Sequence, residues 1–169
     1  ARIREEMKEA GTNVHVVSTI DDICWTLNIR GNDIDFFPLV LSYGIITMDS
    51  FELYIDEKKL DDKLKAKLAK DGVNLHPYND IYEDVKKFGS DVVAMIDPGK
   101  LNYALFNNIP ENVKTVEKRN PAILMKAIKN PVEIENIRKA QIKDSVAHVR
   151  FMKWLKENVG KETITETVS

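Results

Sequence analysis

The stretch that decides the fold is residues 39–55, LVLSYGIITMDSFELYI. Two apolar runs, Leu39–Met48 and Phe51–Ile55, flank the short polar turn Asp49-Ser50. Two such runs around a tight turn predict an antiparallel β-hairpin. Apolar and more polar side chains alternate along the second run, so we expect one face of that strand to meet solvent.

Around this hairpin, short strand and helix patterns alternate. The β-branched run Val14–Ser18 and the apolar run Asp91–Asp97 predict strands. Further strands are expected at Val73–Leu75 and Val113–Val116. One helix is expected to follow the cap residue Thr19 and to run as far as Leu27. The other expected helices are Ala1–Ala10, Asp61–Lys70, Asp80–Phe88 and Lys100–Asn107. A hairpin followed by alternating strands and helices predicts an α/β domain with a mixed sheet and helices packed on it.

No strand pattern follows Pro121. We expect a helix over 122–129 and then a long helix from Val132 to Asn158, which contains no Gly or Pro and is roughly 40 Å long at the usual rise per residue. Its apolar arc is broad, so it needs partners on more than one side. Residues 163–166 have the pattern of another helix start. We therefore predict an α/β domain at residues 1–118 and, at 119–169, the first elements of a second, truncated domain. The start at Ala1, inside a helix pattern, likewise indicates a segment of a longer protein.

Composition excludes several classes of protein. The 169 residues carry 25 Lys plus Arg and 27 Asp plus Glu, a net charge of −2, without the cationic surplus that binding to a nucleic acid requires. No apolar run reaches the length of a membrane span. The single cysteine, Cys24, cannot form an intramolecular disulfide, which favours a reducing, cytoplasmic compartment.

Few residues carry obvious chemistry. Cys24 has no histidine near it in sequence, and zinc and phosphate-loop motifs are absent. Acidic residues near predicted strand ends could hold two metal ions, as in a nuclease of the ribonuclease H type; these are Asp21, Asp22, Asp33, Asp35 and Asp97. However, Asp21 and Asp22 also suit a helix cap, and Asp97 suits a turn.

The most unusual local feature is the polar loop Asn28–Ile34. One interpretation is a turn in which Arg30 pairs with Asp33 or caps a carbonyl. The other is a surface that faces a ligand cleft or a neighbouring domain. The candidate residues of that surface are Trp25, Arg30, Gly31, Asn32 and Asp33.

Several blocks of sequence resemble one known family. They are TIDDICWTLNIRGND (19–33), PLVLSYGIIT (38–47), LYID (53–56), KAIKNPVEIENIRKA (126–140), RFMKWL (150–155) and ITE (164–166). In this order they are similar to the three-domain Xaa-Pro aminopeptidases, the aminopeptidase P group of the creatinase/prolidase superfamily.

The resemblance implies a creatinase-type, ribonuclease-H-like noncatalytic domain at 1–118. It also implies that residues 119–169 are the linker and first helices of a pita-bread catalytic domain. The parent enzyme would hold two divalent metal ions, usually manganese, and would release an N-terminal residue that precedes proline. Its metal ligands and substrate histidines would lie beyond Ser169. No catalytic or metal-ligating residue, and no cofactor, is therefore assigned to this chain, which we expect to be inactive alone.

The expected partners are the other domains of the same protein, a peptide with proline second and, in the parent, a second subunit. No nucleic acid or membrane is expected. Two alternatives remain open at this point: a metal-dependent nuclease on the same fold, and a stand-alone interaction module whose long helix docks a partner.

Overall fold

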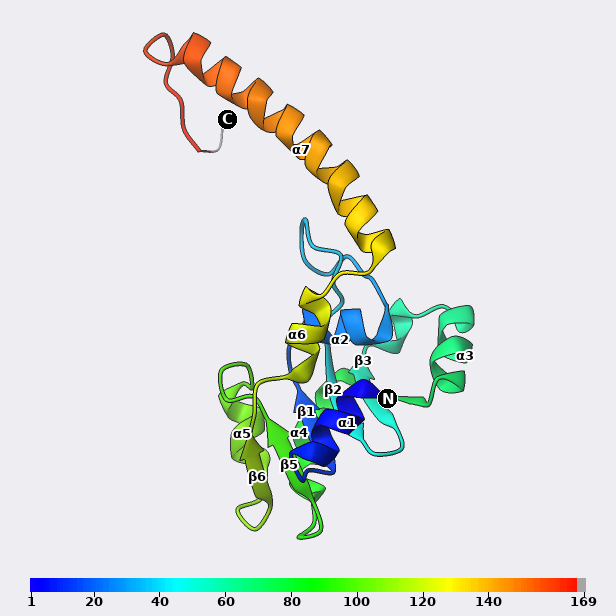
Figure 1. Cartoon of the computed structure of the whole chain (residues 1–169). Coiled ribbons are helices and arrows are strands. Elements are labelled where there is room, and N and C mark those ends of the chain that lie inside the picture. The colour runs from blue at the N-terminus through cyan, green and yellow to red at the C-terminus, as the bar shows by residue number, and fades with distance from the viewer. Residues whose placement is uncertain (167–169) are drawn as a thin grey trace. The chain divides into compact units, whose positions relative to one another are not determined.

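A six-stranded mixed sheet organises residues 1–127, the first of the two units into which the chain divides (Figure 1). The structure is a computed structural model that describes residues 1–166. Its strands are β1 (Val14–Val17), β2 (Ser42–Thr47), β3 (Phe51–Ile55), β4 (Val73–His76), β5 (Val93–Ile96) and β6 (Lys114–Glu117), in the spatial order β4-β3-β2-β1-β5-β6. The predicted mixed α/β architecture is confirmed.

The hairpin of β2 and β3 is antiparallel, with Ile46 opposite Phe51. β1 also runs antiparallel to β2, whereas the β1–β5, β5–β6 and β3–β4 pairs are parallel. The first hairpin strand begins at Ser42 rather than at the predicted Leu39. The reason is that the carbonyls of Pro38 and Leu39 accept hydrogen bonds from the backbone of Gly31 and Asp33, so this segment closes the preceding loop instead.

Helices cover both faces of the sheet (Figure 1). Buried side chains of α1 (Arg2–Glu9), α2 (Ile20–Leu27) and α3 (Asp62–Lys70) form one core with Leu53, Ile55 and Met95. Side chains of α4 (Ile81–Asp84) and α5 (Tyr103–Asn108) form a second core with Val16, Ile45 and Ile96. The last helix of this unit, α6 (Pro121–Ala127), contacts α2.

Two helix predictions in this unit are corrected. The continuous helix expected over Asp80–Phe88 is only one α-helical turn, α4, between the 3-10 turns η2 (Tyr78–Asp80) and η3 (Val85–Lys87), because so short a segment tightens at both ends. The helix expected from Lys100 begins at Tyr103. The backbone N–H groups of Lys100 and Leu101 donate to the carbonyl of Asp97, and the Asn102 side chain caps the helix by accepting from the N–H of Leu105.

The second unit starts at Ile128 and consists mainly of α7 (Pro131–Asn158). Asn130 and Glu133 close its N-terminus with reciprocal side-chain-to-backbone hydrogen bonds, and Pro131 is its first residue. No residue of α7 is buried within the described structure. Residues 163–165 are not helical, so the predicted helix start is wrong over that stretch, and residues 167–169 lie outside the described residues.

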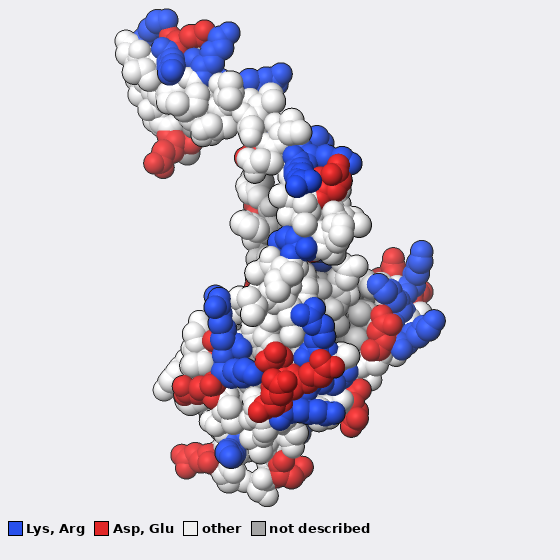
Figure 2. Space-filling model, viewed as in Figure 1, with Lys and Arg blue, Asp and Glu red and all other residues white. Residues whose placement is uncertain are grey.

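Charged side chains are mixed rather than segregated by sign. In Figure 2, Lys and Arg side chains lie among Asp and Glu side chains on the visible face. Among residues 1–166, no helix combines the length and the apolar character that crossing a bilayer requires.

Candidate functional site

The loop that follows α2 is closed by its own backbone and by two charged side chains. Arg30 donates from Nη1 to the carbonyls of Cys24 at 3.2 Å and Ile29 at 2.8 Å. Asp33 accepts from Lys59 Nζ at 2.6 Å and from the N–H of Leu41 at 2.7 Å. The hydrogen bond from Lys59 holds the pKa of Asp33 below its ordinary value. The interpretation that Arg30 caps a carbonyl is confirmed, whereas a pairing of Arg30 with Asp33 is wrong, because Lys59 takes that place.

Gly31 is required by a close approach within this loop. A Cβ atom at this position would lie 2.8 Å from Cβ of Val40. The tip of the loop then presents two aromatic side chains to solvent, since Phe36 is fully exposed and Phe37 is 62% exposed. Asn32 is also exposed. The loop therefore has a fixed base and an exposed aromatic tip.

Trp25 lies apart from the other candidate residues. It is half-buried on α2 and lines a cleft of about 640 Å³ together with Leu27, Phe51, Leu68 and Met125. None of the residues Arg30 to Asp33 lines that cleft. The structure thus brings Arg30, Gly31, Asn32 and Asp33 together in one loop and places Trp25 on a different surface.

A buried polar network, which the sequence interpretation missed, joins β1 to the start of α6. His15 is fully buried; its Nδ1 donates to the Met95 carbonyl at 3.0 Å, and its Nε2 lies 3.2 Å from Oδ1 of Asn120. Asn120 in turn donates from Nδ2 to Oδ2 of Asp22 at 3.0 Å. Burial lowers the pKa of His15. The network connects His15 and Asp22 to Asn120, which follows them by 105 and 98 residues.

Lys126 neutralises the acidic end of this network. Its Nζ donates to Oδ1 of the buried Asp22 at 2.7 Å and also to Oδ2 of Asp21. Partial burial opposes the charged form of Lys126, but the hydrogen bonds to Asp21 and Asp22 outweigh it and raise the pKa of Lys126. For Asp21 the balance is similar: burial opposes ionisation, while Lys126 brings the pKa below its ordinary value. α6 is thereby tied to α2 by ion pairs.

The sequence offers one signal that could have found this network. β1 is a central strand with all four residues buried, so a histidine within its pattern has to find polar partners. The predicted sheet did not specify those partners, because Asn120 follows His15 by 105 residues.

Asp21, Asp22 and Asp97 all line one cleft of about 550 Å³, as the nuclease alternative requires. Their oxygens are already engaged, however. Asp22 accepts hydrogen bonds from Thr19, Asn120 and Lys126, and Asp97 accepts from the backbone N–H groups of Gly99 and Asn120. Within residues 1–166, no three His, Cys, Asp or Glu side chains come together in a way that could hold a metal ion. These residues do not fit a two-metal site.

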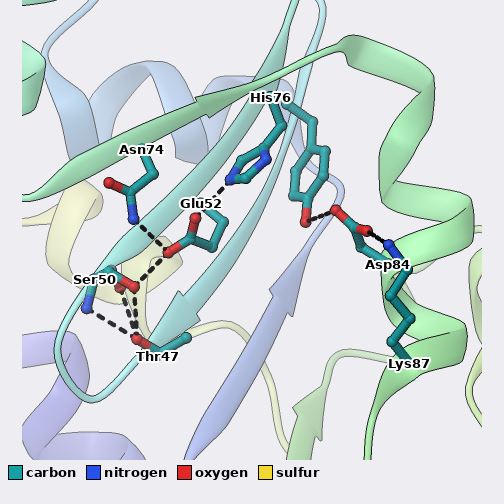
Figure 3. Close-up of polar contacts among 8 residues, drawn as sticks. Thr47, Ser50, Glu52, Asn74, His76, Asp84 and Lys87 are labelled. Carbon is teal, nitrogen blue, oxygen red and sulfur yellow. Dashed lines mark hydrogen bonds and ion pairs between the residues drawn. The ribbon is translucent and has the colours of Figure 1, made fainter.

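A second polar cluster lies on β3 and β4 (Figure 3). Glu52 accepts hydrogen bonds from Ser50, Asn74 at 2.9 Å and His76 at 2.6 Å. Since Ser50 donates to Glu52 rather than to His76, the cluster lacks the Ser–His contact of an activated nucleophile.

The cluster also joins β3 and β4 to the helical segment after η2. The Tyr54 ring stacks on His76 with ring centroids 4.9 Å apart, and its hydroxyl donates to Asp84 at 3.0 Å. Burial and the Asp84 carboxylate raise the pKa of Tyr54. Asp84 also pairs with Lys87 at 2.6 Å. The cluster therefore has a structural role: it holds β3, β4 and α4 together.

Residues 1–133 match the family model described as the creatinase/prolidase N-terminal domain. The chain belongs to this family. The resemblance predicted from residues 19–33 and the later blocks is confirmed.

Relatives of this creatinase/prolidase N-terminal domain are Xaa-Pro aminopeptidases. The chain is 40% identical over 160 residues to Xaa-Pro aminopeptidase 1 of Dictyostelium discoideum. The matched region covers 93% of this chain and 25% of that protein. It is 34% identical to a probable Xaa-Pro aminopeptidase P of Neurospora crassa, with 93% of this chain and 24% of that protein covered. The chain thus spans about a quarter of the length of these curated relatives.

Two solved structures of Xaa-Pro peptidases are similar in fold to this chain. An X-prolyl aminopeptidase of Caenorhabditis elegans, described as a cytosolic enzyme with a di-nuclear active site, superposes with a TM-score of 0.82 at 31% identity and covers 93% of this chain and 26% of its own. A Xaa-Pro dipeptidase of Bacillus anthracis shares the fold, with a TM-score of 0.65 at 16% identity and coverages of 89% and 42%.

Proposed function

We propose that this chain is a noncatalytic creatinase-type domain of a longer, metal-dependent Xaa-Pro aminopeptidase that releases an N-terminal residue preceding proline. The observation that carries the proposal is the 40% identity to the Dictyostelium aminopeptidase over 93% of the chain, combined with the 25% of that protein that the match spans. The activity belongs to the longer protein, and this chain supplies one of its structural parts.

In this proposal residues 1–118 form the noncatalytic domain, and residues 119–169 are the linker and first helices of the catalytic domain. The exposed apolar side chains of α7 support the second assignment, because a helix with such a face is stable when other elements cover it. They are Val132, Ile134, Ile137, Ile142, Val146, Val149, Phe151 and Met152. Within the first unit, Lys126 anchors the linker segment to Asp21 and Asp22.

The metal ions of the parent enzyme would be held outside this chain. The described residues contain no cluster of three metal-ligating side chains, and the worm relative is described as having a di-nuclear active site. We propose that two divalent ions, manganese by the family resemblance, bind to other parts of the longer protein. This chain contributes no ligand and no proton-transfer group to the reaction.

The role proposed for this chain is to shape substrate access and the contacts between domains and subunits. Arg30 and Asp33 hold the base of the loop through backbone carbonyls, Leu41 and Lys59, while Phe36 and Phe37 remain exposed at its tip. A loop with a rigid base and an exposed aromatic tip suits contact with a peptide or a neighbouring domain. The parent would act in the cytoplasm as a homodimer.

A paired assay tests this proposal. The 169-residue chain and the full-length protein are each incubated with Mn²⁺ and a peptide whose second residue is proline. We expect cleavage by the full-length protein only, and no stoichiometric Mn²⁺ binding by the chain alone. Turnover by the chain alone, or a full-length protein that ignores proline, would refute the assignment.

The interaction-module alternative is favoured by the same exposed face of α7. The two functions differ in what is encoded after Ser169. Codons for a metal-ligand set would establish the peptidase, and a stop codon shortly after Ser169 would favour the module.

A further inference from the structure

The cleft of about 550 Å³ in the first unit lies at the edge of the sheet where the parallel strands β1, β5 and β6 end. After β1 the chain enters α2 on one face of the sheet, and after the neighbouring β5 it continues to α5 on the other face. Ligands of open α/β sheets bind at such a point, where connections diverge at the carboxyl ends of strands. The position of the cleft therefore suits a ligand.

Four acidic and four basic side chains line this cleft, but most of them are already engaged. Lys126 pairs with Asp21 and Asp22, and Lys118 pairs with Glu6 at 2.9 Å. Asp97 accepts two backbone N–H groups. These residues form the fixed wall of the cleft.

Three charged side chains of the lining remain available. Two of them are exposed cations: Lys100, on the loop after β5, and Arg119, after β6. The third is the exposed anion Glu117 at the end of β6. None of the three forms an ion pair within residues 1–166. Two cations and one anion around one hollow complement a molecule with a carboxylate at one end and an ammonium at the other. The planar fork of an arginine binds a carboxylate through two parallel hydrogen bonds.

We propose that this cleft binds the zwitterion of a short peptide or free amino acid, with its carboxylate on Lys100 and Arg119 and its ammonium on Glu117. A cleft of about 550 Å³ falls within the usual size range of small-molecule sites. The inference concerns this chain alone and does not depend on the peptidase assignment.

Nuclear magnetic resonance titration of the 169-residue chain tests the proposal. The probes are alanine, alanylalanine, alanylalanine amide, N-acetyl-alanylalanine and inorganic phosphate. We expect free alanine or alanylalanine to shift the amide signals of residues 97–100 and 117–119. Loss of the carboxylate in the amide should weaken binding about tenfold, and N-acetylation should weaken it to a smaller extent. A tighter fit of either alanine or the dipeptide identifies the source of the zwitterion.

Matched variants complete the experiment. Lys100→Gln with Arg119→Gln should abolish the binding, and Glu117→Gln should make the free and acetylated dipeptides bind equally. Lys114→Gln, on the same strand as Glu117 but outside the cleft lining, is the control and should bind as the unmodified chain does. Thermal melting checks that every variant is folded. Equal binding of the dipeptide and its amide, binding of phosphate alone, or no shift in these segments would overturn the proposal.

Discussion

Lys126 Nζ on α6 lies 2.7 Å from Oδ1 of Asp22 on α2, and Asp22 is only 2% exposed. This contact places a positive charge beside a carboxylate that has left water. A buried carboxylate without a cation is costly, so the pair holds α6 in place against α2.

Replacing Lys126 tests this contact. Lys126→Met should lower the free energy of unfolding by about 2 kcal/mol, less than for a fully buried pair because Lys126 is itself partly exposed. Urea unfolding measures the change. Lys70→Met, on the exposed surface of α3, is the control and should stay within about 0.5 kcal/mol. Asp22→Asn added to Lys126→Met should recover part of the loss; a Lys126→Met variant as stable as the unmodified chain would contradict the argument.

The buried His15 predicts how stability depends on pH. Burial lowers its pKa from the ordinary value of 6.5, so the fold favours the neutral ring and the unfolded chain takes up the proton first. The stability contributed by neutral His15 is complete above pH 6.5 and is lost as the pH falls below it. Chemical unfolding of the chain and of His15→Phe at several pH values isolates the effect of His15, because the two proteins differ only at this position. Parallel stability curves for the two proteins would contradict the prediction.

The close approach at Gly31 predicts intolerance of any side chain. Gly31→Ala should destabilise the chain by about 1–2 kcal/mol, because the new Cβ would meet Val40 and force the loop apart. Gly99→Ala is a matched control, since a Cβ there would lie 3.5 Å from Oδ1 of Asp97, an ordinary contact. Differential scanning calorimetry should show a clearly lower Tm for the first variant only, and equal melting would show that the loop can yield.

A kinetic prediction concerns Arg30 in the full-length protein. Arg30→Ala removes the hydrogen bonds to the Cys24 and Ile29 carbonyls and should loosen the base of the loop. If the loop shapes peptide access, KM should rise about threefold while kcat stays unchanged. The control is Arg2→Ala, which alters an exposed arginine outside this loop. Unchanged KM and unchanged melting would argue against this role.

Local patterns predicted the fold well, and distant contacts explain what they missed. The β2–β3 hairpin and α7 follow from contiguous residues, namely the turn at Asp49-Ser50 and the run without Gly or Pro from Val132 to Asn158. For the chain between Pro77 and Phe88, local patterns did not predict the observed structure. The segment tightens at both ends, and the outcome is one α-helical turn between two 3-10 turns.

In the loop after α2 and in the buried polar network, too, the sequence predicted local contacts but not distant ones. That Arg30 caps a carbonyl is a local contact, and it is one of the two interactions of Arg30 that the sequence left open. The partner of Asp33 is Lys59, 26 residues away, and that of His15 is Asn120, 105 residues away. Such pairs depend on how strands are ordered in the sheet, which spacing along the chain does not encode.

The position of β1 has a consequence for synthesis on the ribosome. β1 can pair with β2 as soon as the hairpin has emerged, but its other edge is filled only by β5, which ends at Ile96. Until then the nascent chain carries an open, apolar strand edge of the kind that aggregates. A polypeptide released before residue 93 would keep that edge, so premature termination in this region should yield insoluble product.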